Sequence, residues 1–302
     1  MAPRLRIGID LGGTKTEGIV MDAAGEVLIR ERRPTPRDEG YEAILDGVAG
    51  LVGELERAAG ASCLVGIGTP GAVSAATGLM KNANTTCLNG RPLPEDLEQR
   101  LDRPIRVEND ANCFALSEAV DGAARGYALV FGVILGTGVG GGVVHHGRLH
   151  RGPQHIAGEW GHNVMEMSGP PCYCGRSGCV ETLISGPGLA RDYRQLGGRP
   201  GVDAAGVVAL AREEDPAAEV ALDRFLDRFG RALAGVINIL DPDAVVLGGG
   251  LSNMDELYTE GRERVAHHTF NDELSTPILR PLHGDSAGAR GAAWLWSPEE
   301  RD

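Results

Sequence analysis

The amino-acid sequence predicts an α/β fold built from two lobes of related design with a cleft between them. Segments with strand and helix patterns alternate along the chain, and no repeat of 20–50 residues replaces that alternation. A strand–turn–strand unit near residue 10 has a counterpart near residue 136. We expect an N-terminal lobe over residues 1–112, joined by a helix at 286–302, and a C-terminal lobe over residues 113–285.

The first lobe is expected to begin with strands separated by turns, the first of them a tight glycine turn at Leu11–Thr14. The expected strands are Arg6–Asp10, Lys15–Met21, Val27–Arg32, Leu64–Gly68 and Ile105–Glu108. Apolar residues recur at helical spacing over Tyr41–Ala58, which predicts a long amphipathic helix. Shorter helices are expected over Pro94–Leu101 and Ala111–Ala119.

The second lobe is expected to be built around the strands Ala128–Leu135, Gly142–His145 and Ala244–Leu247. An irregular region is predicted over His145–Ser185. The longest helix is predicted over Pro216–Leu240, and Asp241 ends it because the residue before a proline is driven out of the helical region. Further helices are expected near Asp255–His267 and over Ser286–Trp296.

The composition excludes several classes of function. The 302 residues include 42 acidic and 29 basic side chains, a formal net charge of −13. A surface this acidic repels a phosphate backbone, so we expect no nucleic-acid binding. The first residues contain no apolar run of signal-peptide length, which favours a cytoplasmic protein.

One uncharged run, residues 126–144, is 19 residues long and could span a bilayer by length alone. It contains seven glycines, five of them between Gly136 and Gly142. This favours two buried strands joined by a glycine turn over a membrane helix, so no membrane association is expected.

The segment from Asp10 to Lys15 is a candidate phosphate-binding turn. A carboxylate ends a strand, Gly12 and Gly13 let backbone N–H groups approach phosphate oxygens, and Thr14 adds a hydroxyl donor. The glycines lead into a strand, so this is neither a Walker A loop nor a dinucleotide fingerprint. A simple β-hairpin turn is the alternative.

Two other apolar strands also end in glycine loops, which contain Gly136, Thr137 and Gly138 in one case and Gly248, Gly249 and Gly250 in the other. Ligands of α/β proteins bind at the carboxyl ends of strands. One nucleotide contacted by all three loops explains the pattern better than three coincidental turns.

A candidate metal site lies in the irregular region, where one histidine and three cysteines occur within 18 residues: His162, Cys172, Cys174 and Cys179. This set matches tetrahedral Cys₃His coordination of zinc, and four protein ligands leave no position for substrate, so the zinc would be structural. Free thiols and a redox pair are the alternatives. Cys63, Cys87 and Cys113 are scattered and are expected to be ordinary small residues.

Three carboxylates lie near these features. Asp110 follows a predicted strand, Glu159 precedes His162 by three residues, and Glu181 follows the last cysteine by two. The metal loop would hold Glu159 and Glu181 on a rigid frame, where such acceptors could bind a polyol. Each one taken alone is more simply a solvated surface carboxylate.

At these residues the chain resembles the ROK family of bacterial sugar kinases and repressors. The motifs concerned are the Asp10–Lys15 turn, Asn109–Asn112, Leu135–Gly138, Gly158–His162, Cys172–Cys179 and Gly248–Gly250, which are spread over nearly the whole chain. The resemblance implies an actin-like ATPase fold of the ribonuclease H type, ATP with Mg²⁺ as cofactors, a structural zinc ion, a homodimer, and transfer of the γ-phosphoryl group to a hexose hydroxyl.

The resemblance also implies roles for particular residues. Asp110 matches the catalytic base of the family. Asn109, Asp110, Glu159, His162 and Glu181 match its sugar ligands, His162 also binding zinc, and Gly71 matches a backbone contact to the sugar. Asp10, Gly12, Gly13, Thr14 and Lys15 match nucleotide contacts, as do the glycine loops at 136–142 and 248–250.

Within the family the chain looks most like the fructokinases, through the segments Lys81–Thr86 and Leu88–Gly90 and the tail from His283 to Trp296. Asn82 and Asn84 would then face the sugar. Cys87 departs from the aromatic residue usual in that group, and N-acetylglucosamine, mannose and glucose kinases are alternatives.

Two readings from other classes are also weighed. The family includes repressors with an N-terminal DNA-binding module, which nine residues before Asp10 are too few to form. An inert sugar-binding protein is expected to lack Asp110 or the glycine turn, and both are present.

Overall fold

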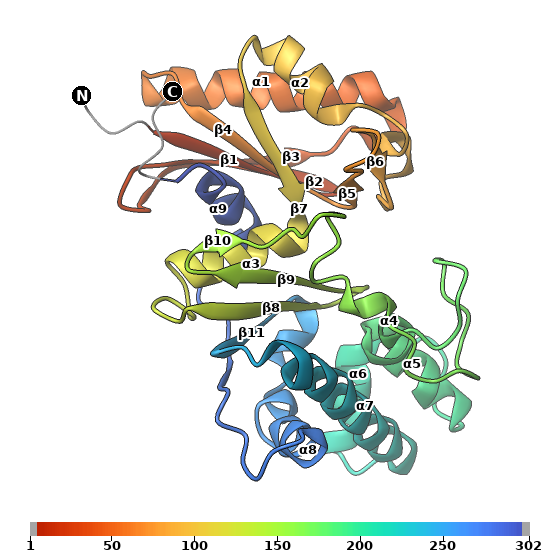
Figure 1. Ribbon diagram of the computed structural model, residues 1–302. Coiled ribbons are helices and arrows are strands. Elements are labelled where there is room, and N and C mark those ends of the chain that lie inside the picture. The colour runs from red at the N-terminus through yellow and green to blue at the C-terminus, as the bar shows by residue number, and fades with distance from the viewer. Residues whose placement is uncertain (1–4, 298–302) are drawn as a thin grey trace. The chain divides into compact units, whose positions relative to one another are not determined.

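The computed structural model describes residues 5–297, which form two compact units (Figure 1). Within the described residues, unit 1 consists of residues 5–125, 147–157 and 283–297, and unit 2 of Gly126–His146 and Gly158–Leu282. The units assign residues 113–125 and 147–157 differently from the lobes expected above, and the lobe boundary after Asn112 stays a prediction.

Unit 1 is organised around a five-stranded mixed sheet. Its strands are β1 (Arg6–Leu11), β2 (Lys15–Met21), β3 (Val27–Pro34), β4 (Leu64–Thr69) and β7 (Ile105–Asn109), in the order β3-β2-β1-β4-β7. The hairpins β1–β2 and β2–β3 are antiparallel, whereas β1, β4 and β7 run parallel. All five strands predicted for this part of the chain are confirmed to within two residues at each end.

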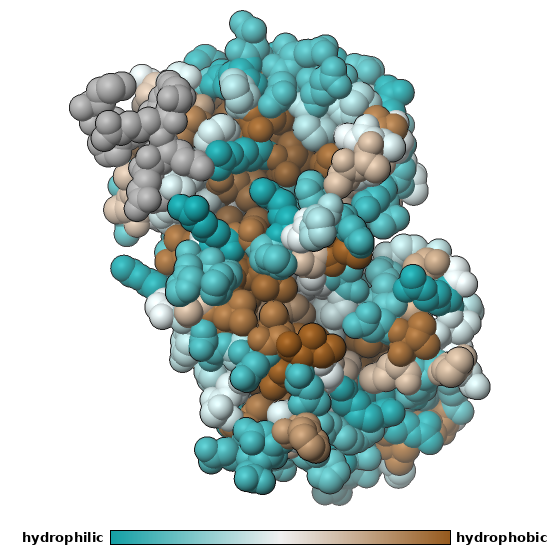
Figure 2. Space-filling model, viewed as in Figure 1, coloured by the Kyte–Doolittle hydropathy of each residue, from teal (hydrophilic) through white to brown (hydrophobic). Residues whose placement is uncertain are grey.

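Helices cover both faces of this sheet: α1 (Tyr41–Ala59) on one, and α9 (Ala287–Trp294) on the other, where α9 packs against α3 (Asp110–Val120) (Figure 1). The apolar stripe of α1 is buried from Ile44 to Leu55, as its helical spacing predicts. Figure 2 shows the outer surface over α1 and α2 (Leu93–Leu101) as largely hydrophilic.

The helix α9 lies so close to the sheet that only glycine fits beneath it. A Cβ atom on Gly8 would lie 1.9 Å from the carbonyl oxygen of Ala289, and one on Gly66 would lie 1.9 Å from that of Ala292. A helix is present in the segment predicted at 286–302, as α9, and the predicted end of that segment lies outside the described residues. That this helix joins the predicted N-terminal lobe stays a prediction.

Short elements complete unit 1. They are the pair β5 (Ala72–Val73) and β6 (Met80–Lys81), β10 (Arg148–Leu149), and the 3₁₀ helices η1 (Arg37–Glu39), η2 (Thr86–Leu88) and η6 (Gly284–Ser286). Cys63 and Cys113 are buried and Cys87 is half-buried.

Unit 2 contains the strands β8 (Leu129–Leu135), β9 (Val139–His145), β11 (Ala244–Gly248) and β12 (Ile278–Leu279), in the order β9-β8-β11-β12. The strand predicted at Gly142–His145 is too short. Residues 140–142 continue the ladder with β8, and a Cβ on Gly141 would lie 2.9 Å from the carbonyl oxygen of Gly158. These glycines therefore permit close packing within a strand and do not form the turn.

The helices of unit 2 are α4 (Val180–Ile184), α5 (Gly186–Gln195), α6 (Ala204–Arg212), α7 (Pro216–Leu240) and α8 (Glu260–His268), with 3₁₀ turns η3 (Trp160–His162), η4 (Gly250–Asn253) and η5 (Asp255–Leu257). The prediction for α7 is confirmed at both ends. The helix predicted near Asp255–His267 is divided into η5 and α8, and the region predicted as irregular includes η3 and α4. Within residues 5–297, no helix has both the length and the apolar character needed to cross a membrane.

Candidate functional site

In unit 1, polar residues gather at one edge of the sheet, where the parallel strands β1, β4 and β7 end. Asp10 pairs with Gly68, and Thr69 pairs with Asn109. Because the carboxyl ends of parallel strands meet at one edge, Asp10, the loop after Thr69 and the start of α3 lie there together. The site residues predicted at these three places are thus brought to one edge of one sheet.

The turn between β1 and β2 has the tight geometry that its sequence predicts. The Gly12 N–H donates to the Lys15 carbonyl oxygen at 3.0 Å, and the Thr35 hydroxyl donates to the Gly12 carbonyl oxygen at 2.7 Å. A Cβ on Gly12 would lie 2.8 Å from the Lys15 oxygen. The side chains of Thr14 and Lys15 are exposed at this turn, so they can reach a ligand.

The carboxyl group of Asp10 is confined beside α9. A Cβ on Gly288 would lie 2.7 Å from its Oδ2 atom. Burial raises the pKa of Asp10 to about 7, and the negative charges of Asp110 and Glu17 contribute to this rise, against the opposing charge of Lys15. A divalent cation would favour the ionised form of such a carboxyl group.

Asn109 connects two of the predicted site segments. Its Oδ1 atom accepts hydrogen bonds from the N–H groups of Ala111 (2.9 Å) and Asn112 (3.3 Å), which caps α3. Its Nδ2 atom donates to the Gly71 carbonyl oxygen at 2.8 Å. The cap therefore fixes the first turn of α3, which carries Asp110, relative to the loop that carries Gly71.

The loop with Asn82 and Asn84 lies against the same segments. A Cβ on Gly71, whose φ is +79°, would lie 2.5 Å from the Lys81 carbonyl oxygen. Asn82 also has a positive φ, 59°, and Asn84 Oδ1 would lie 3.8 Å from a Cβ on Gly13. The structure thus brings Asn84 next to the β1–β2 turn, and both asparagine side chains are exposed.

In unit 2, the two remaining glycine loops lie side by side. A Cβ on Gly136 would lie 3.9 Å from the Gly250 nitrogen, and one on Gly249 would lie 2.3 Å from the Leu135 carbonyl oxygen. Gly249 also has a φ of +78°, a conformation that glycine adopts readily. The backbones of the two loops approach closely at these glycines, and the prediction that one nucleotide contacts all three glycine loops stays a prediction.

Glu181 is held against the first of these loops. Its Oε2 atom accepts the Val139 N–H at 3.0 Å, and a Cβ on Gly138 would lie 2.6 Å from the same oxygen. The third carboxylate of the sequence prediction, Glu159, is exposed and directly precedes η3.

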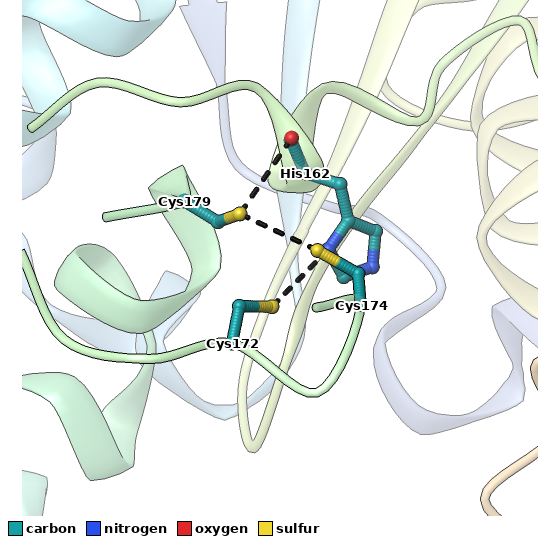
Figure 3. A group of neighbouring side chains, drawn as sticks. All are labelled: His162, Cys172, Cys174 and Cys179. Atoms are coloured by element: carbon teal, nitrogen blue, oxygen red, sulfur yellow. Dashed lines mark hydrogen bonds between the residues drawn. The ribbon is translucent and has the colours of Figure 1, made fainter. Parts of the chain in front are cut away.

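The four predicted metal ligands converge in unit 2, with their ligand atoms within 4.8 Å of one another (Figure 3). The Cys172 sulfur lies 3.5 Å from Nδ1 of His162, and the sulfurs of Cys174 and Cys179 lie 3.6 Å apart. Tetrahedral bonds of about 2.3 Å to sulfur and about 2.0 Å to nitrogen place such atoms about 3.8 and 3.5 Å apart. The donor set and its spacing therefore fit zinc.

The loop is arranged to keep these ligands in place. A Cβ on Gly178 would lie 1.5 Å from the Glu166 carbonyl oxygen, and the Gly178 N–H donates to the Pro170 carbonyl oxygen at 2.7 Å. The other ring nitrogen of His162, Nε2, lies 2.9 Å from the hydroxyl of Tyr173. This partner orients the imidazole so that Nδ1 faces the three sulfurs, as outer partners of metal-bound histidines do.

Several residues of these sites were missed by the sequence reasoning. Tyr173 and Thr35 hydrogen-bond to site residues, Gly288 makes room for Asp10, and Glu108 and Arg151 form an ion pair at the base of α3. Tyr173 could have been suspected from its place between two cysteines. Thr35, Gly288 and Arg151 are distant in sequence from the site residues they contact, and Glu108 is distant from its ion-pair partner Arg151, so these contacts carry no local signal.

Comparisons with known proteins match nearly the full length of the chain. The model of the ROK family matches residues 6–299. An N-acetyl-D-glucosamine kinase from Escherichia coli O6:H1 is 42% identical over 298 residues, which cover 95% of this chain and 98% of that protein. An N-acetyl-D-glucosamine kinase from Escherichia fergusonii gives the same identity and coverage.

Solved structures agree with the sequence comparisons. A ROK hexokinase from Thermus thermophilus superimposes with a TM-score of 0.87 at 36% identity, covering 96% of this chain and 97% of that one. A ROK family glucokinase from Streptomyces griseus, in complex with glucose and AMPPNP, gives a TM-score of 0.78 at 31% identity, covering 96% and 98%. These likenesses confirm the actin-like fold class predicted from the sequence.

Proposed function

The chain belongs to the ROK family, and we propose that it is a kinase that transfers the γ-phosphoryl group of ATP to the primary hydroxyl of N-acetyl-D-glucosamine. The observation that carries this proposal is the 42% identity to an N-acetyl-D-glucosamine kinase over 98% of its length. The fructokinase specificity expected from residues 81–90 and from the tail finds no support in the comparisons. The comparisons support the alternative, an N-acetylglucosamine kinase.

Asp110 is proposed as the general base. It is the first residue of α3, and its Oδ1 accepts the Ala111 N–H at 2.8 Å, so the carboxylate is held by the backbone at the helix start. A carboxylate fixed in this way can accept the proton of a sugar hydroxyl as the oxygen attacks phosphorus. The same helix start stabilises its negative charge.

The nucleotide is proposed to contact the Asp10–Lys15 turn and the glycine loops at 136–138 and 248–250. The tight glycine backbone at each place supports this, because N–H groups that approach closely can donate to phosphate oxygens. Asp10 would hold Mg²⁺, which supplies positive charge against the phosphates when bound.

The sugar is proposed to bind through Gly71, Asn82, Asn84, Asn109, Asp110, Glu159, His162 and Glu181. Support comes from the ties already described between Asn109 and Gly71, and between Glu181 and Val139. Carboxylates and amides held in this way can accept and donate hydrogen bonds to sugar hydroxyls. These two ties fix Asn109 and Glu181 through backbone contacts.

The zinc ion is proposed to be structural. His162, Cys172, Cys174 and Cys179 supply four ligands, so a tetrahedral ion would have no position left for water or sugar. Its role would be to fix the loop that leads from His162 to Glu181.

The homodimer implied by family resemblance also stays a proposal. Light scattering coupled to size-exclusion chromatography tests it.

The test is ADP release by the purified chain with Mg·ATP and each of N-acetylglucosamine, N-acetylmannosamine, glucose, mannose and fructose. We expect the highest kcat/KM with N-acetylglucosamine. The control is Asp110→Asn, which keeps the shape but removes the base and should lower kcat by a factor of about 10²–10⁴. Highest turnover with fructose would overturn the substrate assignment, and turnover with none of these sugars would overturn the kinase assignment.

A further inference from the structure

An ion pair lies at the base of α3, beside the proposed catalytic base. Glu108, the residue before Asn109 in β7, has a side chain only 11% exposed, and it pairs with the guanidinium of Arg151. Arg151 belongs to the segment Gly147–Ala157 of unit 1 and follows β10, which lies against α3. The two residues are 43 positions apart in the chain.

The carboxylate of Glu108 organises the start of α3 through its other oxygen. Oε1 accepts the backbone N–H of Asn109 at 2.9 Å and the side-chain amide of Asn112 at 3.0 Å. These two residues lie on either side of the first turn of α3, with Asp110 between them. Glu108 therefore adds two hydrogen bonds to the helix start, beside those that the Asn109 cap makes there.

Arg151 also balances charge at this place. Asp10, Glu108 and Asp110 bring three carboxyl groups around the buried Cys113. Burial, followed by these three charges, raises the pKa of the Cys113 thiol, whereas the charge of Arg151 lowers it. Arg151 therefore lies close enough to offset the negative charge that surrounds the start of α3.

We propose that Arg151 is a positioning residue for this kinase, which holds the Glu108 carboxylate against the first turn of α3 and so fixes the orientation of Asp110. The inference rests on the proposed function, because it assigns to Arg151 an effect on the proposed base. Without the guanidinium, Glu108 would be a poorly solvated carboxylate with two neutral donors, close to two other acids. That arrangement favours displacement of Glu108 and, with it, of the helix start.

A surface ion pair of no consequence is the competing explanation, since Arg151 itself is 44% exposed. Four variants separate the two: Arg151→Met, Arg151→Lys, the double variant Glu108→Gln/Arg151→Met, and Arg148→Met. Arg148 lies on the same segment and is exposed, so its replacement is the matched control. The rates are measured with the preferred sugar at saturating ATP, after the unfolding midpoint of each variant has been compared with that of the wild type.

We expect Arg151→Met to lower kcat by a factor of about 10–100, as small misplacements of a catalytic group do. Arg151→Lys should recover most of that loss. The double variant should be faster than Arg151→Met alone, because the Glu108→Gln side chain keeps an acceptor for Asn109 and Asn112 but carries no unbalanced charge. Arg148→Met should remain within about twofold of the wild type, as a surface substitution should.

The recovery in the double variant is the readout that a merely structural contact would not give. A kcat within about twofold of wild type for Arg151→Met, or a double variant no faster than the single one, would overturn the proposal. If Arg151→Met does not fold at the assay temperature, Arg151→Gln takes its place with the same expectations.

Hydrogen exchange separates this inference from the proposed function. Backbone amides of residues 105–115 should exchange faster in Arg151→Met and return toward the wild-type rate in the double variant. If the wild type phosphorylates no sugar but exchange follows this pattern, the kinase assignment fails while the tie from Arg151 to the helix start stands. An active wild type with unchanged exchange in Arg151→Met would overturn the positioning role alone.

Discussion

The side-chain amide of Asn109 donates a 2.8 Å hydrogen bond to the carbonyl oxygen of Gly71, 38 residues earlier in the chain. The same side chain caps α3 through its oxygen. Asn109 therefore caps α3 with its side-chain oxygen and binds the loop after β4 with its side-chain nitrogen. This division makes the two contributions separable by mutation.

Asn109→Ala should lower the free energy of unfolding by about 1–2 kcal/mol, the usual value of a lost helix cap. Asn109→Ser keeps an oxygen that can cap the helix but loses the amide nitrogen that donates to the Gly71 carbonyl oxygen, so it should retain most of that stability. Both variants should raise the KM for the sugar by a factor of about 10, comparable to a hydrogen bond of about 1.4 kcal/mol. Urea unfolding measures the change in stability, and steady-state kinetics measures the change in KM. Equal KM values for Asn109→Ser and wild type would contradict the predicted rise in KM.

The zinc proposal predicts one ion per chain by elemental analysis. Cys174→Ser should lose the ion and lower the free energy of unfolding by about 4 kcal/mol, which is what a ligand present at about a thousandfold excess over its Kd contributes. Cys87→Ser is the matched control, because Cys87 lies outside the cluster, and it should retain zinc. Equal zinc content in the two variants would show that the cluster does not hold the metal.

Asp10→Asn should make the chain more stable but lower its turnover. Burial raises the pKa of Asp10 to about 7, helped by Asp110 and Glu17, so ionising Asp10 opposes folding in the absence of Mg²⁺. The sign follows from linkage: the wild type loses stability as the pH rises from about 4 to 7, whereas Asn at this position does not titrate.

The stability difference between Asp10→Asn and the wild type should therefore be absent near pH 4, grow up to about pH 7 and then stay constant. Urea midpoints measured without Mg²⁺ between about pH 5 and pH 8 test this. Asp38→Asn, at a side chain 95% exposed, should show no such trend. Turnover of Asp10→Asn should fall by a factor of about 10² or more, as loss of charge stabilisation in phosphoryl transfer implies. A stability difference that shrinks as the pH rises would contradict the assignment.

Gly66→Ala should destabilise unit 1 by about 3 kcal/mol, because the added methyl group would lie 1.9 Å from the Ala292 carbonyl oxygen. Gly50→Ala is the opposite case. Gly50 lies in α1 with nothing within 4 Å of an added Cβ, so alanine there should stabilise the helix by up to about 1 kcal/mol. Thermal unfolding measures the two opposite changes in stability. A Gly66→Ala variant as stable as the wild type would show that α9 can move away from the sheet at no cost.

Elements with a strong local pattern were predictable from the sequence. The bounds of α7 follow from a long apolar stripe, the Asp215 cap and the Asp241–Pro242 stop. The helix α5 has no such signal, because it begins Gly186-Pro187-Gly188, residues that usually mark a turn. Its start is fixed instead by the Ser185 hydroxyl, which accepts the Gly188 N–H at 3.2 Å.

The same distinction applies to the candidate site. The zinc ligands were predictable because their spacing is short and chemically specific. The pairing of Glu108 with Arg151 was not predictable, because it depends on how β7 and the distant segment Gly147–Ala157 pack together. The glycines at 140–142 misled for a related reason: a glycine required by close packing and a glycine required by a turn look alike in a sequence.

The position of α9 against the sheet bears on how the chain folds as it is made. Gly8 lies in the first strand and meets Ala289, so about 280 residues are synthesised between the two sides of this contact. At about 5–20 residues per second, that interval is on the order of 15–60 s. Until α9 is made, the face of the first sheet that it will cover lacks this helix, and all of unit 2, which ends at Leu282, is synthesised before α9. Burial of that face against α9 is therefore among the last contacts that unit 1 can complete during synthesis.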